Sequence, residues 1–466
     1  MAIARLYSNR KDIPDWLEIG VPTYTGGEGS IFFSRDGQYA IKIYHRQRAV
    51  LTKRQLLEKI TLLGANLTAD EAQFLCWPLA LVADVDGNEC VGCVTRRIPT
   101  PPYVVLMNIM LTPKQAAEQF RAGKSWANYL QIARGIARSI AVLNSKGCAH
   151  ADLHFRNFLV NPSKSDVVLI DLDGLVVPGF LPPQVAGMYG FMAPEVVIGK
   201  STPNERSDRH SLAALILYTL LFRNVMRPQV TYDSDNEDND ARISWGKEAI
   251  FSEHPQDRRN RPRMLGVPLF QQGALSYHIL TPALQRITER AFIDGLYSPD
   301  RRPSAREWIN ALSYALDELW RCSYCRLHFP YPHWIKPVQR RACPLCGQRI
   351  AAPFPSVLLL YEPRSKGNYI FIKRYLVMSS GWRLFADVLD SQRPPMSRRD
   401  EPSIGHVEWD DKRKTNRLVN DEAVVWRARL GEDGSDITVS KDASVPLHPR
   451  TTIHFGEGRR LLVIHE

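Results

Sequence analysis

Hydrophobic positions change their period along the chain and so divide it into parts. Over residues 1–98, short runs of β-branched and aromatic residues surround one segment, 49–63, whose apolar residues recur at helical spacing. From 99 to 318 the helical period dominates. It is clearest over 127–145, 207–222, 281–291 and 304–319. From 353 to 466 short β-rich runs alternate with turns, at a spacing typical of a small sandwich or barrel. The pattern therefore predicts an α+β protein.

A chain of 466 residues is too long for one hydrophobic core, so several domains are expected. We predict four of them, with boundaries at the changes of pattern: 1–98, 99–318, 319–352 and 353–466. A polar segment of the second domain, about 227–265, carries an acidic run and then a basic run. It is expected to be a solvated surface insertion, and pairing between its two runs stays open.

The net charge of +11 is typical of a basic, soluble surface. The same positive field would also attract acidic nucleotides, acidic substrates or an acidic partner protein. Basic residues are scattered, and no run interleaves Lys or Arg with aromatic residues, so nucleic-acid binding is disfavoured. No apolar run approaches the roughly 18 residues of a membrane span. The first residues also lack the charged start and apolar stretch of a signal peptide. We therefore expect a cytoplasmic protein without membrane contacts.

Eight cysteines in a cytoplasmic chain favour metal binding or free thiols over disulfides. Two Cys-x-x-Cys pairs are separated by 17 residues, the spacing of a zinc ribbon. They are Cys322, Cys325, Cys343 and Cys346. Four thiolates leave no open coordination position, so the predicted zinc ion is structural. Cys90 and Cys93 form a third pair on a predicted strand, but their odd separation points them to opposite faces and argues against chelation.

Polar residues of the first domain suit the binding of phosphate groups. Gly26, Gly27 and Gly29 let backbone N–H groups approach phosphates closely, and Ile31 would cover a base, although a plain hairpin turn explains the glycines as well. Lys42 lies in the apolar strand 39–44 and would reach the α- and β-phosphates. A buried ammonium needs a carboxylate, and the predicted helix offers Glu58; otherwise the two are unrelated surface residues.

Three further residues complete the pattern in the second domain. Asp152 would accept or orient the proton of an attacking hydroxyl. Asn157 follows five residues later, and Asp171 comes directly after the apolar run 167–170. Their oxygens would hold magnesium, which prefers hard oxygen ligands. The ordered set predicts a chain that binds a nucleoside triphosphate with metal and transfers its terminal phosphate.

These motifs resemble the eukaryotic-type protein kinase superfamily over roughly residues 20–318. Ala193-Pro194-Glu195 resembles that family's Ala-Pro-Glu, 207–212 its central-helix signature, and 301–303 the element whose arginine pairs with the glutamate. The resemblance implies a bilobal kinase fold, followed here by the zinc ribbon and a small all-β domain. It also implies ATP with Mg²⁺ or Mn²⁺, transfer to Ser or Thr of a protein, bonds from Asp208 to the catalytic-loop backbone, and an Arg302–Glu195 pair.

Departures from the family pattern carry their own predictions. Ala151 stands where many kinases have the arginine that docks a phosphorylated activation loop, and 172–194 contains no Ser or Thr. We therefore predict that Ser/Thr phosphorylation of this loop does not switch the enzyme on. His154 occupies the place of a lysine near the γ-phosphate, with a charge that is only partial near neutral pH. Asp173 replaces a glycine and is either a second metal ligand or merely solvated.

Two rival functions stay open. Residues 150–154 with Asn157 also resemble aminoglycoside- and choline-phosphotransferases, which act on small molecules, and a pseudokinase scaffold is the third alternative. The layout, with segments 246–263 and 291–296, is similar to bacterial kinases of the tellurite-resistance-associated set. That resemblance implies a von Willebrand A-domain protein and a PP2C-type phosphatase as companions in signalling or stress response. The C-terminal β-rich domain is expected to mediate interactions.

Overall fold

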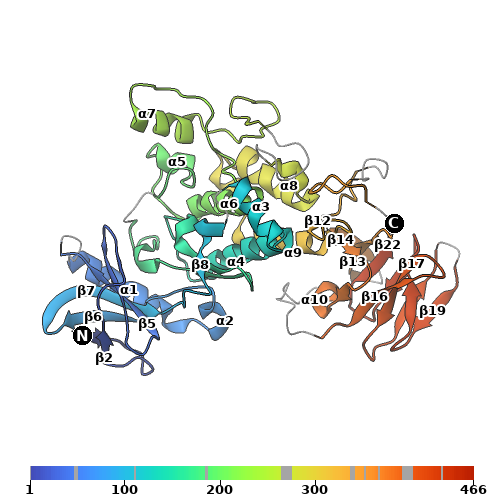
Figure 1. Ribbon diagram of the computed structural model, residues 1–466, viewed down its shortest axis with the longest axis horizontal. Coiled ribbons are helices and arrows are strands. Elements are labelled where there is room, and N and C mark those ends of the chain that lie inside the picture. Colours follow the sequence, from blue (N-terminus) through green and yellow to red (C-terminus); the bar gives the residue numbers. More distant parts are fainter. Residues whose placement is uncertain are drawn as a thin grey trace.

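The computed structural model describes residues 2–46, 51–109, 112–183, 187–263, 275–335, 342–350, 353–365, 368–390, 402–431 and 434–465. Its elements run from a β-sheet at the N-terminal end, through a block of helices, to two β-sheets at the C-terminal end (Figure 1). This mixture of helix and sheet is compatible with the α+β prediction. Within the described ranges, no helix combines the length and the apolar character that a bilayer crossing requires.

Seven antiparallel strands form the N-terminal sheet, in the order β2-β1-β6-β7-β5-β4-β3. Their bounds are Ala2–Tyr7 (β1), Trp16–Ile19 (β2), Tyr24–Thr25 (β3), Gly29–Phe33 (β4), Tyr39–Tyr44 (β5), Ala80–Val85 (β6) and Asn88–Arg96 (β7). Side chains alternate between the two faces of the sheet. On one face Tyr44 and Cys93 pack against Leu57 of helix α1 (Leu51–Leu63), and on the other Ile41 belongs to a separate cluster. Cys90 packs against the Ile41 cluster, so the prediction of opposite faces for Cys90 and Cys93 is confirmed.

The helical block surrounds the largest hydrophobic cluster of the described residues. Helix α4 (Trp126–Ser145) packs against α6 (Glu205–Leu221) and α9 (Ala305–Asp317), and α8 (Pro282–Glu289) packs against α9. These helices agree with the predicted ones to within two residues at each end. Their starts follow from local capping, because Asn204 accepts backbone N–H groups at the start of α6 and Ser304 forms a capping box with Glu307 at the start of α9.

Shorter elements complete the block. They are the helices α2 (Ala69–Ala72), α3 (Pro113–Arg121), α5 (Pro194–Val197) and α7 (Glu237–Arg242), and the strands β8 (Val104–Val105), β9 (Phe158–Asn161) and β10 (Asp166–Leu169). The three strands form an antiparallel sheet in the order β10-β9-β8. Strand β10 packs against α4, so the segments on either side of β9 and β10 are held close to the central helix.

The expected insertion, 227–265, is only partly solvated over its described residues. Helix α7 contains no buried residue, but Phe251 and Asn260 are 0% and 2% exposed. The segment is anchored because Phe251 packs into the hydrophobic cluster of the helical block, while Asn260 holds the segment together by hydrogen bonds with Gln229 and Ile250. The described ion pairs of the segment also show how its basic run pairs. Arg259 binds Glu248 at 3.3 Å and Asp257 at 2.8 Å rather than a carboxylate of the earlier acidic run.

The C-terminal part follows α9 with a short hairpin, β11 (Leu319–Arg321) and β12 (His328–Pro330). Ten more strands form two antiparallel sheets, with orders β14-β13-β22-β21-β18-β19 and β15-β16-β17-β20. Their bounds are Ser356–Pro363 (β13), Tyr369–Met378 (β14), Arg383–Leu384 (β15), Gly405–Asp410 (β16), Thr415–Asn420 (β17), Trp426–Arg429 (β18), Asp436–Val439 (β19), Ser444–Pro446 (β20), Thr452–His454 (β21) and Leu461–Ile464 (β22), with one short helix, α10 (Ala386–Leu389). Both sheets contribute to one hydrophobic cluster, which is the arrangement of a sandwich.

The sandwich is joined to the helical block through a buried ion pair. Arg374 on β14 donates two hydrogen bonds, of 2.9 and 2.6 Å, to the carboxylate of Asp317 at the end of α9. Both side chains are almost completely buried, at 2% and 0% exposure. A second buried pair, His333 with Glu318 at 2.8 Å, lies beside it. These contacts fix the start of the C-terminal part on α9.

Candidate active site and metal centre

A cavity of about 640 Å³ lies where the N-terminal sheet meets the segments around β9 and β10. Seven of the predicted site residues line it. They are Gly26, Gly27, Gly29, Ile31, Lys42, Asn157 and Asp171. Apolar side chains such as Ala40 and Leu159 line the same cavity, which gives it the mixed lining of a ligand pocket. Residues more than a hundred positions apart in sequence are therefore brought together at one site.

The turn between β3 and β4 contains the glycines. A Cβ on Gly29 would lie 2.3 Å from the carbonyl oxygen of Ile43, so only glycine allows β4 and β5 to approach this closely. Gly26 and Gly27 have nothing within 4 Å of an added Cβ, so their backbone borders open space in the cavity. The turn is closed by the hydrogen bond from Gly26 N–H to the Gly29 carbonyl, at 2.9 Å.

Lys42 is the centre of the charge network in the cavity. Its Nζ lies 2.9 Å from the carboxylate of Asp171, 2.7 Å from that of Asp173 and 3.5 Å from that of Glu28. Burial lowers the pKa of Lys42, but the carboxylates of Asp173 and Asp171 outweigh it and hold that pKa above its ordinary value. Lys42 is thus a charged ammonium that contacts both carboxylates at the wall of the cavity.

Glu58 does not take the position that the sequence predicted. It lies 3.7 Å from Arg54 on its own helix and is 49% exposed, and it is absent from the described partners of Lys42. Helix α1 presents Lys53 instead, whose Nζ donates to the carbonyl of Asp173 at 3.1 Å. Five residues separate Lys53 from Glu58, which is about 140° around a helix, so the two side chains cannot face the cavity together.

A loop between α4 and β9 carries the candidate base. His154 Nε2 lies 3.3 Å from the Asp152 carboxylate, and Asn157 donates from Nδ2 to the Asp152 carbonyl at 2.8 Å. Asp208 on α6 accepts the backbone N–H groups of His150 and Ala151 at 2.6 and 3.1 Å. Ala151 has a φ of 69°, in the left-handed region, so these two bonds offset a strained backbone. Asp152 and His154 belong to this loop, but neither side chain lines the cavity of the glycine turn.

The possible metal ligands lie on adjacent backbone. Ile170 N–H donates to the Asn157 carbonyl at 2.8 Å, which places Asp171 one residue from that contact. Because Asn157 uses its Nδ2 for Asp152, its amide oxygen is left to face a cation. The Asp171 carboxylate is 47% exposed, toward the cavity. This amide and these carboxylates are the hard oxygen donors that magnesium prefers, so the residues present fit such an ion.

Two resemblance-based contacts can be checked directly. Arg302 donates to both carboxylate oxygens of Glu195, at 2.7 and 2.8 Å, and Asp208 binds the loop backbone as described above. The Arg302 side chain is fully buried and also donates to the carbonyls of Gly295 and Leu296, both at 2.8 Å. The predicted pairing is therefore present, in the strong bidentate geometry.

The four predicted zinc ligands form a compact cluster. The sulfur atoms of Cys322, Cys325, Cys343 and Cys346 all lie within 4.8 Å of one another. Two of the separations, Cys322–Cys346 and Cys325–Cys343, are 3.9 Å. A tetrahedral zinc ion with Zn–S bonds near 2.3 Å separates its sulfurs by about 3.8 Å, which is close to these two separations, so the cluster could hold a zinc ion.

Local backbone geometry builds each half of this cluster. The N–H groups of Tyr324 and Leu345 point at the sulfurs of Cys322 and Cys343, both at 3.4 Å. Each turn then closes through a left-handed residue. Arg326 has a φ of 63° and Gly347 a φ of 73°. The two Cys-x-x-Cys pairs therefore form equivalent turns, or knuckles. The left-handed position is Arg326 in the first and Gly347 in the second.

Sequence reasoning missed Lys53 and Glu28. Lys53 lies 3.9 Å from the Asp173 carboxylate, and burial together with the nearby Lys42 charge lowers the pKa of Lys53. A lysine near the start of an amphipathic helix normally points to water, so the position of Lys53 in the helical pattern gave no sign that its side chain would be buried. Glu28 lies between the predicted glycines, and its charge within the glycine turn was the available signal.

Comparison with known proteins gives a distant likeness. No family model matches the chain. Over 330 residues it is 24% identical to two proteins named protein kinase YegI, one from Escherichia coli strain K12 and one from Escherichia coli O157:H7. The alignment covers 69% of this chain and 47% of each relative, so the chain spans about half the length of the curated relatives it matches. The chain is thus a distant homologue of bacterial proteins named as protein kinases.

Proposed function

We propose that the chain is an ATP-dependent protein kinase with a bilobal kinase fold, which transfers the γ-phosphate to Ser or Thr of a partner protein. The observation that carries the proposal is the convergence of Lys42, Asn157, Asp171 and the glycine turn on one cavity of about 640 Å³. That volume suits a nucleotide-sized ligand. The likeness to proteins named protein kinase YegI supports the same reaction class.

The proposed mechanism assigns each group a separate task. Backbone N–H groups of the glycine turn bind phosphate oxygens, and the Lys42 ammonium orients the α- and β-phosphates. Asp152 accepts the proton of the attacking hydroxyl, and His154, 3.3 Å away, holds that carboxylate in place. Asn157, Asp171 and Asp173 are the candidate ligands of Mg²⁺ or Mn²⁺, which supplies charge neutralisation for the phosphates when bound. Glu58 has no task in this arrangement, because Lys42 already has carboxylate partners.

A protein substrate is favoured over a small molecule. The buried Arg302–Glu195 pair and the bonds of Asp208 to the loop backbone are elements that the resemblance ties to protein kinases. One observation favours a scaffold without turnover as the second candidate. Asp173 and Asp171 both hold Lys42, so the ammonium must leave at least one of them to reach a phosphate. The von Willebrand A-domain and PP2C-type companions stay predictions from resemblance.

The test is transfer of label from γ-labelled ATP, with magnesium, to protein. We expect autophosphorylation or labelling of added protein by the wild type, and a loss of about 10²–10⁴-fold in Asp152→Asn, since the base is removed while the fold is kept. Phosphoamino-acid analysis should then find phosphoserine or phosphothreonine. Label on kanamycin or choline instead of protein would support the small-molecule rival. Nucleotide binding with no transfer in either variant would support the scaffold.

A further inference from the structure

Helix α1 contacts the segment that follows β10 through two lysines. Lys53 donates from Nζ to the backbone carbonyl of Asp173 at 3.1 Å, and the same Nζ lies 3.9 Å from the Asp173 carboxylate. Lys59 donates to the carbonyl of Phe180 at 3.3 Å and lies over the Phe180 ring, 4.4 Å from its centre. The helix therefore contributes cations at this contact, and the segment contributes oxygen acceptors.

The environment of Lys53 is unusual for a lysine near the start of a helix. Its side chain is only 15% exposed, and its Nζ lies 4.7 Å from the centre of the Tyr44 ring. The Nζ of Lys42 lies 5.1 Å from the same ring centre, so two ammonium groups share one aromatic ring. Burial and the charge of Lys42 lower the pKa of Lys53. The Tyr44 ring and the oxygens of Asp173 stabilise the Lys53 ammonium in this position.

The two carboxylates beside Lys42 differ in how firmly the structure holds them. Asp171 is 47% exposed and lines the cavity, so it can exchange Lys42 for a cation that enters there. Asp173 is 9% exposed and lies 2.7 Å from Lys42, while Lys53 binds its backbone. A buried carboxylate that left Lys42 would lose most of its compensating charge. Asp173 is therefore the carboxylate that stays with Lys42.

We propose that Lys53 is a positioning residue, which holds Asp173 as the fixed carboxylate partner of Lys42. This is the task that the sequence predicted for Glu58, and here two residues of opposite charge share it. The inference rests on the proposed nucleotide site and narrows it, because it leaves Asp171 for the metal and assigns Asp173 to Lys42. A fixed partner orients the Lys42 ammonium before the nucleotide arrives, so less ordering is needed on binding. Lys53 is absent from the described lining of the cavity, so it acts through Asp173 and not on the nucleotide itself.

The test is a double-mutant cycle on the full chain, made of Lys53→Met, Asp173→Asn and the combined variant, with ATP affinity measured by calorimetric titration in the presence of magnesium. We expect Lys53→Met to weaken ATP binding about threefold or more in the wild-type background. In the Asp173→Asn background the same change should alter affinity by less than about twofold, because no carboxylate is left to hold. Lys53→Arg should bind ATP within about twofold of the wild type, because a cationic donor is retained.

The matched control is Arg54→Met, which removes a cation from the next position of α1. Arg54 lies 3.7 Å from Glu58 and 3.3 Å from Glu89, so its variant should bind ATP as the wild type does. Urea denaturation without nucleotide verifies that each variant folds and supplies a second cycle. There too the effect of Lys53→Met on the midpoint should shrink in the Asp173→Asn background, because the contact exists before ATP binds.

An equal loss of affinity on Lys53→Met in both backgrounds would overturn the inference, because Lys53 would then act independently of Asp173. So would unchanged affinity in Lys53→Met, or an equal loss in Arg54→Met or Lys53→Arg. The absence of ATP binding by the wild type would instead overturn the proposed function, and with it any role of Lys53 toward a nucleotide. Failure of the positioning inference alone is thus distinguishable from failure of the kinase proposal.

Discussion

At the scale of single residues, the environment of Lys42 differs from the sequence expectation because of one neighbour, Asp173. The family pattern has glycine there, and the resemblance left Asp173 as a metal ligand or a solvated residue. Its side chain is 9% exposed and lies 2.7 Å from Lys42, so the solvated alternative is wrong. Lys53 packs beside the same carboxylate, and its ammonium would otherwise be buried next to a like charge. Asp173 therefore lies within ion-pair distance of two lysines, and Asp171 adds a second carboxylate beside Lys42.

The Lys42–Asp171 pair predicts an acid-side dependence of stability. Burial raises the pKa of Asp171, but the ammonium of Lys42 outweighs it, so the folded pKa lies below the ordinary value of 3.8. A carboxylate with a lowered folded pKa stabilises the fold above its unfolded pKa, and this contribution is lost as the pH falls through the folded value. Because Asp171 is 47% exposed, the contribution should be below about 1 kcal/mol.

Asp171→Asn should therefore lower the free energy of unfolding at pH 7, and its difference from the wild type should shrink as the pH falls below 3.8. Urea denaturation from pH 7 to pH 3 measures the difference. Asp12→Asn, at an exposed pair with Arg10, is a control for general effects of charge removal. A difference that stays constant down to the lowest pH would contradict the assignment.

At the scale of elements, the sequence predicted the features that depend on local contacts, such as the cysteine turns and the helix starts. It did not predict the rotation of α1, which depends on packing. The cysteine cluster follows from turns of four residues, whose N–H···S bonds are fixed within each knuckle. The starts of α6 and α9 follow from their capping residues. Glu58 was assigned from the rule that a buried lysine needs a carboxylate, but which face of α1 meets the sheet depends on packing against β6 and β7. Sequence spacing along one helix cannot determine that rotation.

The knuckles give a prediction for the cysteine-bearing element. Cys325→Ser should remove the bound zinc and unfold this segment, because a structural Cys₄ site contributes on the order of 10 kcal/mol. Zinc content by mass spectrometry and resistance of residues 319–352 to proteolysis measure the two effects. Cys90→Ser, at a thiol outside the cluster, should keep both. Unchanged zinc in Cys325→Ser would rule out the proposed site.

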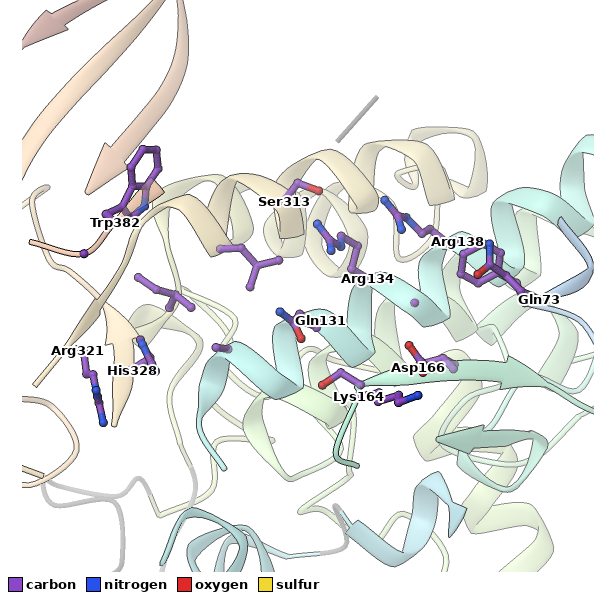
Figure 2. Close-up of a pocket in the computed structure, with 18 of the residues that line it drawn as sticks. Gln73, Gln131, Arg134, Arg138, Lys164, Asp166, Ser313, Arg321, His328 and Trp382 are labelled. Atoms are coloured by element: carbon purple, nitrogen blue, oxygen red, sulfur yellow. The ribbon is translucent and has the colours of Figure 1, made fainter. Parts of the chain in front are cut away.

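At the scale of the whole molecule, the glycine-turn cavity and the cysteine cluster lie in different parts of the chain, and both adjoin the helical block, because β10 packs against α4 and α9 leads into the hairpin that carries Cys322. The glycine-turn cavity is lined by residues of the N-terminal sheet and of the segments around β9 and β10, and a second cavity is lined by residues of α4, α9 and the sandwich loop 379–382 (Figure 2). The order of these parts could be predicted from the change in hydrophobic period. The gathering of Gln73, Arg134 and Trp382 around one cavity could not, because only the tertiary packing brings residues this far apart in sequence together.

The central claim is that groups distant in sequence bind one nucleoside triphosphate, and calorimetric titration with ATP and magnesium tests it most directly. The wild type should bind ATP. Lys42→Met should weaken binding about tenfold or more because a charged contact to the phosphates is lost, whereas Asp152→Asn should retain it. The Lys42→Met and Asp171→Asn variants should both bind ADP more weakly than the wild type does. The absence of ATP binding by the wild type, or equal affinity in Lys42→Met, would contradict the account.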